Sequence, residues 1–240
     1  MAESRRNRSR SVAGAFLDDL VSGQIAAWQA ERGIDDFTVT DLGGGTGTFA
    51  ITLAQQGHQV TVIDPSLDAL ASLQRRTTER RLSDRLRGVQ GDASELVGLI
   101  GADSTDVMVC HRTLEVIDDP TTALAAMAEV VRPGGVLSVV VPLRRAVVLS
   151  QALQGHIDAA LEALDDPTRF DPDDVAALIG RAGFTVQDIS GVGTLASHVP
   201  QAVLEEQPRL ADQLYELESR ICRDHAFRAI APWAHIFARR

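Results

Sequence analysis

The residues with the clearest chemical potential are an acid and the closely spaced glycines that follow it. Asp41 lies at the end of a β-rich run over 37–42. The glycines that come next are Gly43, Gly44, Gly45 and Gly47. Glycine adopts positive φ and lets backbone amides approach a ligand with no Cβ in between. The segment 46–56 has a helical pattern, so its N-terminal amides would point at the same place. This arrangement predicts a loop that holds a nucleotide-like cofactor.

A second acid, Asp64, closes the next apolar run, 59–64. In nucleotide-binding βαβ units an acid at this distance meets the ribose hydroxyls. A dinucleotide fingerprint, G-x-G-x-x-G, would need a glycine where Thr48 stands, which disfavours an NAD or FAD site. The alternative without a ligand is a tight strand–helix turn. Two acids and four glycines are more than such a turn requires.

An acid before G-x-G-x-G, with a further acid at the end of the next strand, resembles the cofactor site of class I S-adenosylmethionine-dependent methyltransferases. The resemblance implies S-adenosyl-L-methionine as cofactor and S-adenosyl-L-homocysteine as product. It places Gly43, Gly44 and Gly45 under the methionine part, with Asp41 at the head of that loop. It also places Asp64 on both ribose hydroxyls.

Asp92 and Ala93 follow the third predicted strand, 86–90. In the methyltransferase family an acid at this point faces the adenine amino group, and the next amide faces a ring nitrogen. The alternative is a capping box, in which Asp92 caps a helix and Glu95 stands three residues on. The two roles are compatible.

His111 follows the fourth predicted strand, 105–110, whose C-terminal end lies beside the cofactor in a doubly wound sheet. An imidazole there could take a proton from a hydroxyl or an amine during methyl transfer. The alternative is a histidine that only hydrogen-bonds the cofactor or a loop carbonyl. Cys110 stands in an apolar strand and is interpreted as a small buried hydrophobe.

Three further segments resemble the bacterial tRNA carboxymethoxyuridine methyltransferases (CmoM). Residues 111–120 match the pattern His-x-x-Leu-Glu-x-x-x-Asp-Pro, and residues 217–223 and 236–239 match segments near the C-terminus of that family. The resemblance implies an enzyme that methylates the carboxylate of a carboxymethoxy-type uridine at the tRNA wobble position. It implies cofactor contacts at the glycine loop, Asp64, the Asp92–Ala93 turn and His111.

Other functions stay open. One is a methyltransferase that acts on a small-molecule carboxylate or hydroxyl, with the segments 13–29 and 144–165 as a lid. Another is a non-catalytic relative that binds a nucleotide-like ligand or a protein. The Asn/Asp-Pro-Pro-Tyr motif that methylation of exocyclic base amines needs does not follow the fourth strand, which disfavours base N-methylation.

The acceptor decides which side chains matter. A carboxylate is ionised at pH 7 and needs only a cation to orient it. Candidates for that cation, and so for substrate binding, are Arg112, Arg220 and Arg223. A hydroxyl acceptor needs a general base instead, and His111 is the candidate catalytic residue.

Composition excludes several classes. The chain has 240 residues, 45% of them hydrophobic and 23% charged, and no long apolar run, so no membrane partner is expected. All 23 basic residues are arginines, which removes Schiff-base and P-loop lysines. Two cysteines and scattered histidines predict neither disulfides nor a metal site. A net charge of −10 predicts no DNA partner and only a local contact with RNA. We expect a cytoplasmic monomer or homodimer.

The elements that must position these residues alternate. Strands are predicted at 37–42, 59–64, 86–90, 105–110, 135–142, 184–189 and 231–238, and helices at 46–56, 66–82, 94–100, 119–131, 144–165, 171–183 and 200–226. This pattern predicts a Rossmann-like, doubly wound α/β sheet. The family resemblance implies seven strands, the last one antiparallel. We expect a disordered basic tail over 1–12 and one methyltransferase domain over 13–240, with helical cover at 13–35 and a helical lid or insertion at 144–165.

Overall fold

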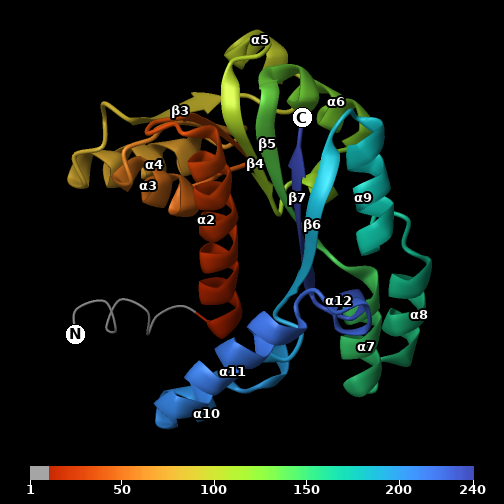
Figure 1. Cartoon of the computed structure of the whole chain (residues 1–240). Coiled ribbons are helices and arrows are strands. Elements are labelled where there is room, and N and C mark those ends of the chain that lie inside the picture. Colours follow the sequence, from red (N-terminus) through yellow and green to blue (C-terminus); the bar gives the residue numbers. More distant parts are fainter. Residues whose placement is uncertain (1–10) are drawn as a thin grey trace. The chain divides into compact units, whose positions relative to one another are not determined.

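A seven-stranded sheet is the centre of the computed structural model, which describes residues 11–240 (Figure 1). Residues 1–10, and with them most of the predicted tail, lie outside the described residues. The strands are β1 Thr38–Leu42, β2 Gln59–Asp64, β3 Leu86–Gln90, β4 Thr105–His111, β5 Val131–Pro142, β6 Thr185–Val192 and β7 Trp233–Arg239. Their order is β3-β2-β1-β4-β5-β7-β6. The predicted fold class is confirmed.

The first five strands are parallel. β7 runs the other way, because Gly134 N–H donates to Arg240 O at the start of β5, and Leu143 N–H donates to Pro232 O at its end. The direction of strand order reverses between β1 and β4. In open α/β sheets the ligand crevice lies at this reversal, outside the carboxyl ends of the strands.

Helices alternate with the strands as predicted as far as β5. They are α2 Val12–Arg32, α3 Thr48–Gln55, α4 Leu67–Glu79, α5 Leu96–Ile100, α6 Pro120–Val130, α7 Arg144–Leu153, α8 Ile157–Asp165, α9 Pro172–Arg181, α10 Gln201–Glu206, α11 Pro208–Ile221 and α12 His225–Ala229. Single 3₁₀ turns occur at Leu114–Val116 and Ala196–His198. None of the helices within residues 11–240 has the length and apolar character to cross a membrane.

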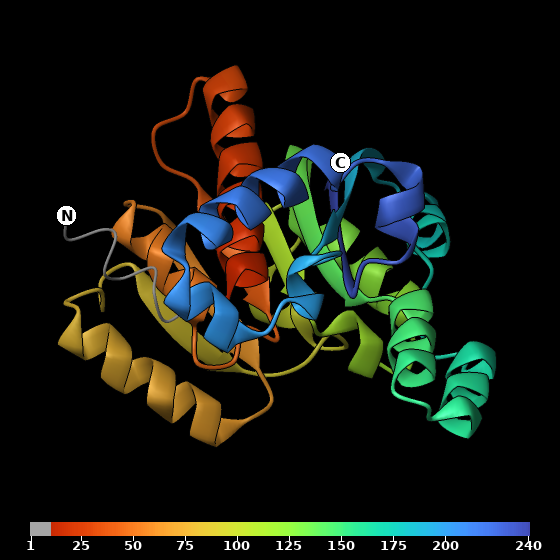
Figure 2. The same ribbon diagram turned by 90° about the horizontal axis from the view of Figure 1, so that it is seen from below.

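Two predicted helices are interrupted. The segment 144–165 is a hairpin of α7 and α8, which lie side by side in both views (Figures 1 and 2). The break is at Gly155, whose φ of 81° a helix cannot contain. The segment 200–226 breaks before Pro208, which has no N–H to donate. It breaks again at Asp224, whose carboxylate accepts from the first amides of α12.

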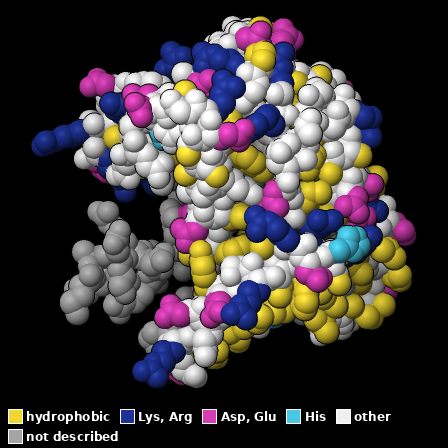
Figure 3. Space-filling model, viewed as in Figure 1, with side chains coloured by type: hydrophobic (Ala, Val, Ile, Leu, Met, Phe, Trp, Pro, Cys, Tyr) yellow, Lys and Arg dark blue, Asp and Glu magenta, His cyan; other side chains and the backbone are white. Residues whose placement is uncertain are grey.

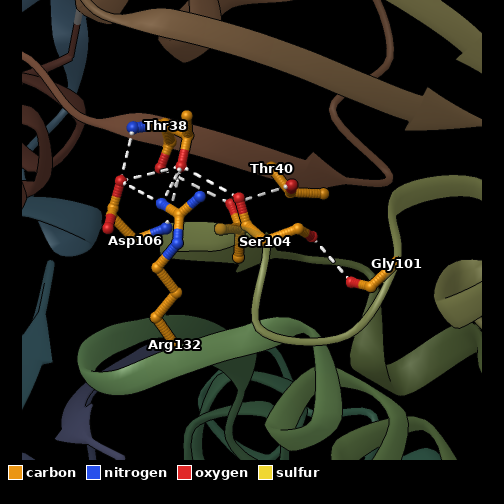
Figure 4. A network of polar contacts seen from close by, with 7 residues as sticks. Thr38, Thr40, Gly101, Ser104, Asp106 and Arg132 are labelled. Carbon is orange, nitrogen blue, oxygen red and sulfur yellow. Dashed lines mark hydrogen bonds and ion pairs between the residues drawn. The ribbon is translucent and has the colours of Figure 1, made fainter.

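The start of β5 is four residues earlier than predicted. Thr105 pairs with Val131 but Val107 pairs with Val136, so residues 132–135 form a bulge directly after the end of α6. From this bulge the Arg132 guanidinium reaches Asp106 Oδ2 at 2.7 Å and Thr38 Oγ1 at 3.0 Å (Figure 4). The bulge therefore ties the first residues of β5 to β4 and β1.

The chain forms two compact units. Within the described residues, unit 1 comprises 11–24, Val141–Val175 and Ile189–His235, and unit 2 comprises Ile25–Val140, Ala176–Asp188 and Ile236–Arg240. In unit 1 the fully buried Glu218 of α11 accepts hydrogen bonds from three successive amides, at 2.6–3.1 Å. The amides belong to Thr194, Leu195 and Ala196. This carboxylate therefore fixes the segment after β6 to α11.

Candidate active site

The glycine loop joins β1 to α3 in unit 2. Three of its glycines have no room for a side chain: a Cβ at Gly43 would overlap Thr113, one at Gly44 would lie 2.5 Å from Asp41 Oδ2, and one at Gly47 would overlap Leu73. Gly45 differs. Its φ is 55°, and the nearest atom to an added Cβ is Asp64 Oδ2 at 3.8 Å. Gly45 thus lines open space, where a ligand can approach the backbone.

Gly45 and Gly47 should respond differently to substitution by alanine, because Gly45→Ala should mainly weaken cofactor binding and Gly47→Ala should mainly lower stability. Gly45→Ala should cost about 1 kcal/mol of stability for its left-handed φ, because no side chain blocks the new methyl group. It should still weaken cofactor binding at least tenfold, because the methyl fills the open space. Gly47→Ala should cost about 2–3 kcal/mol, because it overpacks against buried Leu73. Denaturant unfolding measures the stability of each variant, and calorimetric titration with S-adenosyl-L-homocysteine measures its affinity for the cofactor product. Equal losses of stability in the two variants would contradict the assignment of Gly45.

Asp64 is held in one orientation. Its Oδ2 accepts from Gly45 N–H at 2.8 Å, and its Oδ1 accepts from Ser66 N–H at 2.9 Å. Ser66 in turn caps α4 by accepting from Ala69 N–H. Each carboxylate oxygen can accept a second hydrogen bond. The side chain is therefore prepared to receive two adjacent hydroxyls.

Asp41 lies beneath the loop with 4% of its surface exposed. Burial, and secondarily the charge of Asp64, raises the pKa of Asp41 to about 7. An acid that titrates near neutrality beside a candidate ligand site responds to any charge that binds there.

Asp92 lies just beyond β3, whose last residue, Gln90, pairs with Asp64. The predicted capping box is wrong: Asp92 Oδ1 accepts from Ser94 N–H and Oγ–H at 2.8 and 2.6 Å, and α5 begins only at Leu96. The hydrogen bonds from Ser94 lower the pKa of Asp92. This local turn leaves Asp92 exposed at the same sheet edge as Asp64.

His111 is the last residue of β4. Its Nε2 lies 2.9 Å from Oγ of Ser138, a fully buried residue of β5. The centroid of its ring lies 5.5 Å from the ring centroid of Phe49 in α3. Cys110 is fully buried, which confirms its interpretation as a small buried hydrophobe, and burial raises the pKa of its thiol. The imidazole is thus fixed between the sheet and the helix that follows the glycine loop.

The three predicted cations are distributed over both units. Arg112 follows β4 in unit 2 with φ of 55°, held there by its N–H donating to Val140 O at 2.8 Å. Its side chain is exposed. Arg220 and Arg223 belong to unit 1, where Arg220 pairs with Glu216 on α11. The structure thus joins Arg112 to the same unit as the glycine loop and His111.

Sequence reasoning missed two residues of this site. Ser138 is a fully buried hydroxyl inside an apolar strand, and it bonds His111. A lone serine in a valine-rich run was the available signal. Thr113 fills the space beside Gly43 and donates from Oγ1 to His111 O at 3.2 Å. Nothing local to Thr113 indicates that contact.

The family model that matches the chain is a methyltransferase domain, over residues 40–139. That range contains the glycine loop, Asp64, the Asp92–Ala93 turn and His111. The chain is an S-adenosylmethionine-dependent methyltransferase with the class I fold.

Two relatives and one solved structure show which methyltransferases the chain resembles. The tRNA 5-carboxymethoxyuridine methyltransferase of Escherichia coli (strain K12) is 26% identical, over 97% of this chain and 92% of the relative. The ubiquinone biosynthesis O-methyltransferase of Xanthomonas axonopodis pv. citri (strain 306) is 30% identical, over 64% of this chain and 65% of the relative. The solved 1,6-didemethyltoxoflavin-N1-methyltransferase of Burkholderia thailandensis, with bound S-adenosylhomocysteine, is 20% identical and covers 90% of this chain and 75% of its own, with a TM-score of 0.55.

Proposed function

We propose that this methyltransferase acts on the carboxylate of a carboxymethoxy-type wobble uridine in tRNA. The observation that carries the proposal is the likeness to the E. coli tRNA enzyme, which extends over 97% of this chain, both units included. The likeness to the ubiquinone-pathway enzyme extends over 64%. Function depends on the site rather than on the shared fold, so a likeness that also covers the segments outside residues 40–139 favours tRNA.

The residues of unit 2 fit the cofactor. We propose that the Asp64 carboxylate binds the two ribose hydroxyls and that the Gly45 backbone lines the methionine part. The Asp92–Ala93 turn would contact the adenine, and Asp41 and His111 would complete the site. When bound, the cofactor supplies a methyl group on a sulfonium, which a nucleophile attacks in line. The chain's own contribution is to orient the acceptor and exclude water.

A carboxylate acceptor requires a cation rather than a base, because it is already ionised at pH 7. Arg112 is the candidate in the same unit as the glycine loop. Its left-handed backbone is costly for an arginine, and such residues concentrate at functional sites. Arg220 and Arg223 stay candidates from unit 1. A tRNA acceptor would also place the enzyme in the cytoplasm. We further propose that the enzyme is a monomer or homodimer and that residues 13–240, with both compact units, form one methyltransferase domain.

The test is transfer of labelled methyl from S-adenosyl-L-methionine to bulk tRNA taken from cells that lack this gene. We expect label in a wobble-uridine nucleoside, released by mild base as an ester must be. Tight cofactor binding with no label in tRNA would overturn the tRNA acceptor and favour a small molecule. Label that resists base would overturn the carboxylate.

A small hydroxyl acceptor is the second candidate, favoured by the 30% identity to an O-methyltransferase and by the position of His111 at the end of β4. The two candidates predict different effects of His111→Ala. On a hydroxyl, loss of the general base should lower kcat about 10²–10⁴-fold. On a carboxylate we expect less than a roughly tenfold loss, since no proton is removed. Single-turnover assays at saturating cofactor measure the difference, with His156→Ala at an exposed site as control.

A further inference from the structure

The basic residues of this acidic chain are concentrated in one segment. Residues 75–87 contain six arginines and two acids, a net charge of +4, whereas the whole chain carries −10. The arginines are Arg75, Arg76, Arg80, Arg81, Arg85 and Arg87. They extend from the second half of α4 to the beginning of β3, which pack against each other in unit 2. We call these six side chains the α4–β3 patch.

The patch is exposed and uncompensated. Five of its arginines are exposed, and Arg76 is half-buried. Within residues 11–240, no carboxylate lies within 4.0 Å of any of the six. Arginines elsewhere in the described part of the chain do form ion pairs, among them Arg132, Arg145, Arg169, Arg220, Arg228, Arg239 and Arg240. In Figure 3 dark-blue side chains lie along the upper left, the side on which Figure 1 places α4 and β3. The patch therefore keeps its positive charge available.

Neutral partners fix three of these guanidinium groups in place. Arg76 donates to Thr46 O at 2.6 Å, Arg87 Nε donates to Thr61 Oγ1 at 3.1 Å, and Arg85 donates to Gly57 O. Carbonyl and hydroxyl oxygens orient a guanidinium without cancelling its charge. Thr46 belongs to the glycine loop, so one end of the patch adjoins the cofactor site.

Helix stabilisation does not account for the patch. Cations favour a helix C-terminus, which suits Arg80 and Arg81. That interaction fades beyond the last turn and does not extend to Arg85 and Arg87. Arg81 also takes φ of 58° just past α4, a position where glycine is usual. An arginine there costs about 1 kcal/mol, so its charge is retained against a conformational penalty.

A cavity of about 310 Å³ adjoins the far end of the patch. It lies at the amino ends of β1 to β4, whereas the glycine loop follows the carboxyl end of β1. Its lining includes Arg85 and Arg87 with the hydroxyls of Thr38, Thr61 and Ser83, and one acid, Asp84. Hydroxyl and guanidinium donors around a hollow fit a phosphate or a ribose.

We propose that the α4–β3 patch binds the phosphate backbone of the tRNA, an inference that rests on the tRNA acceptor proposed above. The six guanidinium groups of the patch can meet on the order of six phosphates, one for each cation. A chain of net charge −10 repels RNA elsewhere, which makes a local cationic surface necessary for binding.

The test compares two double substitutions that remove the same charge. Arg75→Gln/Arg81→Gln lies in the patch, and Arg181→Gln/Arg209→Gln removes two exposed arginines outside it. For the patch variant we expect the Kd for tRNA to rise roughly tenfold, and the slope of log K against log salt to fall by about 1.5–2. The KM for tRNA should rise with kcat retained, and cofactor affinity should not change. The control variant should match the wild type in all five quantities.

The outcomes separate this proposal from the proposed function. Equal tRNA affinities of the wild type and the patch variant would overturn the proposal that the patch binds tRNA, whatever the methyl acceptor is. Patch-dependent tRNA binding without methyl transfer would support the patch and overturn the tRNA acceptor. No tRNA binding by wild type at low salt would overturn both. If the first variant unfolds, Arg80→Gln/Arg87→Gln provides the same comparison.

Discussion

Asp64→Ala should weaken binding of S-adenosyl-L-methionine by about 10²–10⁴-fold. The Asp64 carboxylate is held by the amides of Gly45 and Ser66, which leaves both oxygens able to accept from the ribose. A hydrogen bond to a charged group contributes about 1.5–3 kcal/mol, and two of them give this range. Isothermal titration with cofactor and product measures the loss, and it should appear equally for both ligands because the ribose is common to them.

A matched control distinguishes this contact from a general effect of charge. Asp68 lies in the first turn of α4, four residues after Asp64, and its side chain is exposed. Asp68→Ala removes the same charge a few residues away and should leave affinity within about twofold, because exposed charges are screened. Cofactor affinity that survives Asp64→Ala in a folded protein, verified by circular dichroism, would show that the ribose is held elsewhere and would remove Asp64 from the site.

The local part of this fold could be predicted from the sequence. Apolar runs that end in Asp41 and Asp64, with glycines between them, indicated β1, the loop and β2 because strand period and turn chemistry are local. The bulge at 132–135 could not be predicted. Pro-Gly-Gly after a helix favours a stop signal, and the contacts that make it a bulge come from Asp106 and Arg240, which only tertiary structure brings close.

The same distinction applies within the site. The sequence marked the glycine loop, but not which glycine faces the ligand. That depends on Thr113 and Leu73, which occupy the space beside Gly43 and Gly47 and leave Gly45 open. The pairing of His111 with Ser138 depends likewise on the register of β4 against β5. Side chains supplied by distant segments decide the roles within a motif that is local in sequence.

Asp41 gives the free protein a particular dependence on pH. Its ordinary pKa is 3.8, and burial with the nearby charge of Asp64 raises the pKa to about 7 in the folded state. Folding therefore favours the protonated acid. The stability contributed by this proton is complete below about pH 4, declines as pH rises toward 7 and does not change further above it. The shift corresponds to about 4 kcal/mol, since one pKa unit is about 1.4 kcal/mol.

Asp41→Asn should remove this dependence, because an amide has no proton to lose. The stability of the variant relative to wild type should therefore rise by about 3 kcal/mol between pH 5 and pH 8. Denaturant unfolding at several pH values measures it.

Asp106 is the contrasting acid. Its burial, which raises the pKa, is outweighed by hydrogen bonds from Thr38 and Arg132, so the pKa lies below 3.8. Asp106→Asn should destabilise the protein by an amount that stays constant from pH 5 to pH 8 and shrinks only in stronger acid.

A constant difference in the free energy of unfolding between Asp41→Asn and the wild type over the same pH range would mean that Asp41 is ionised in the folded protein. Asp41 would then carry a resident negative charge beneath the glycine loop. If the difference rises as expected, the site instead gains that charge only as pH approaches neutrality, and a cationic cofactor should bind more tightly at pH 8 than at pH 5.5.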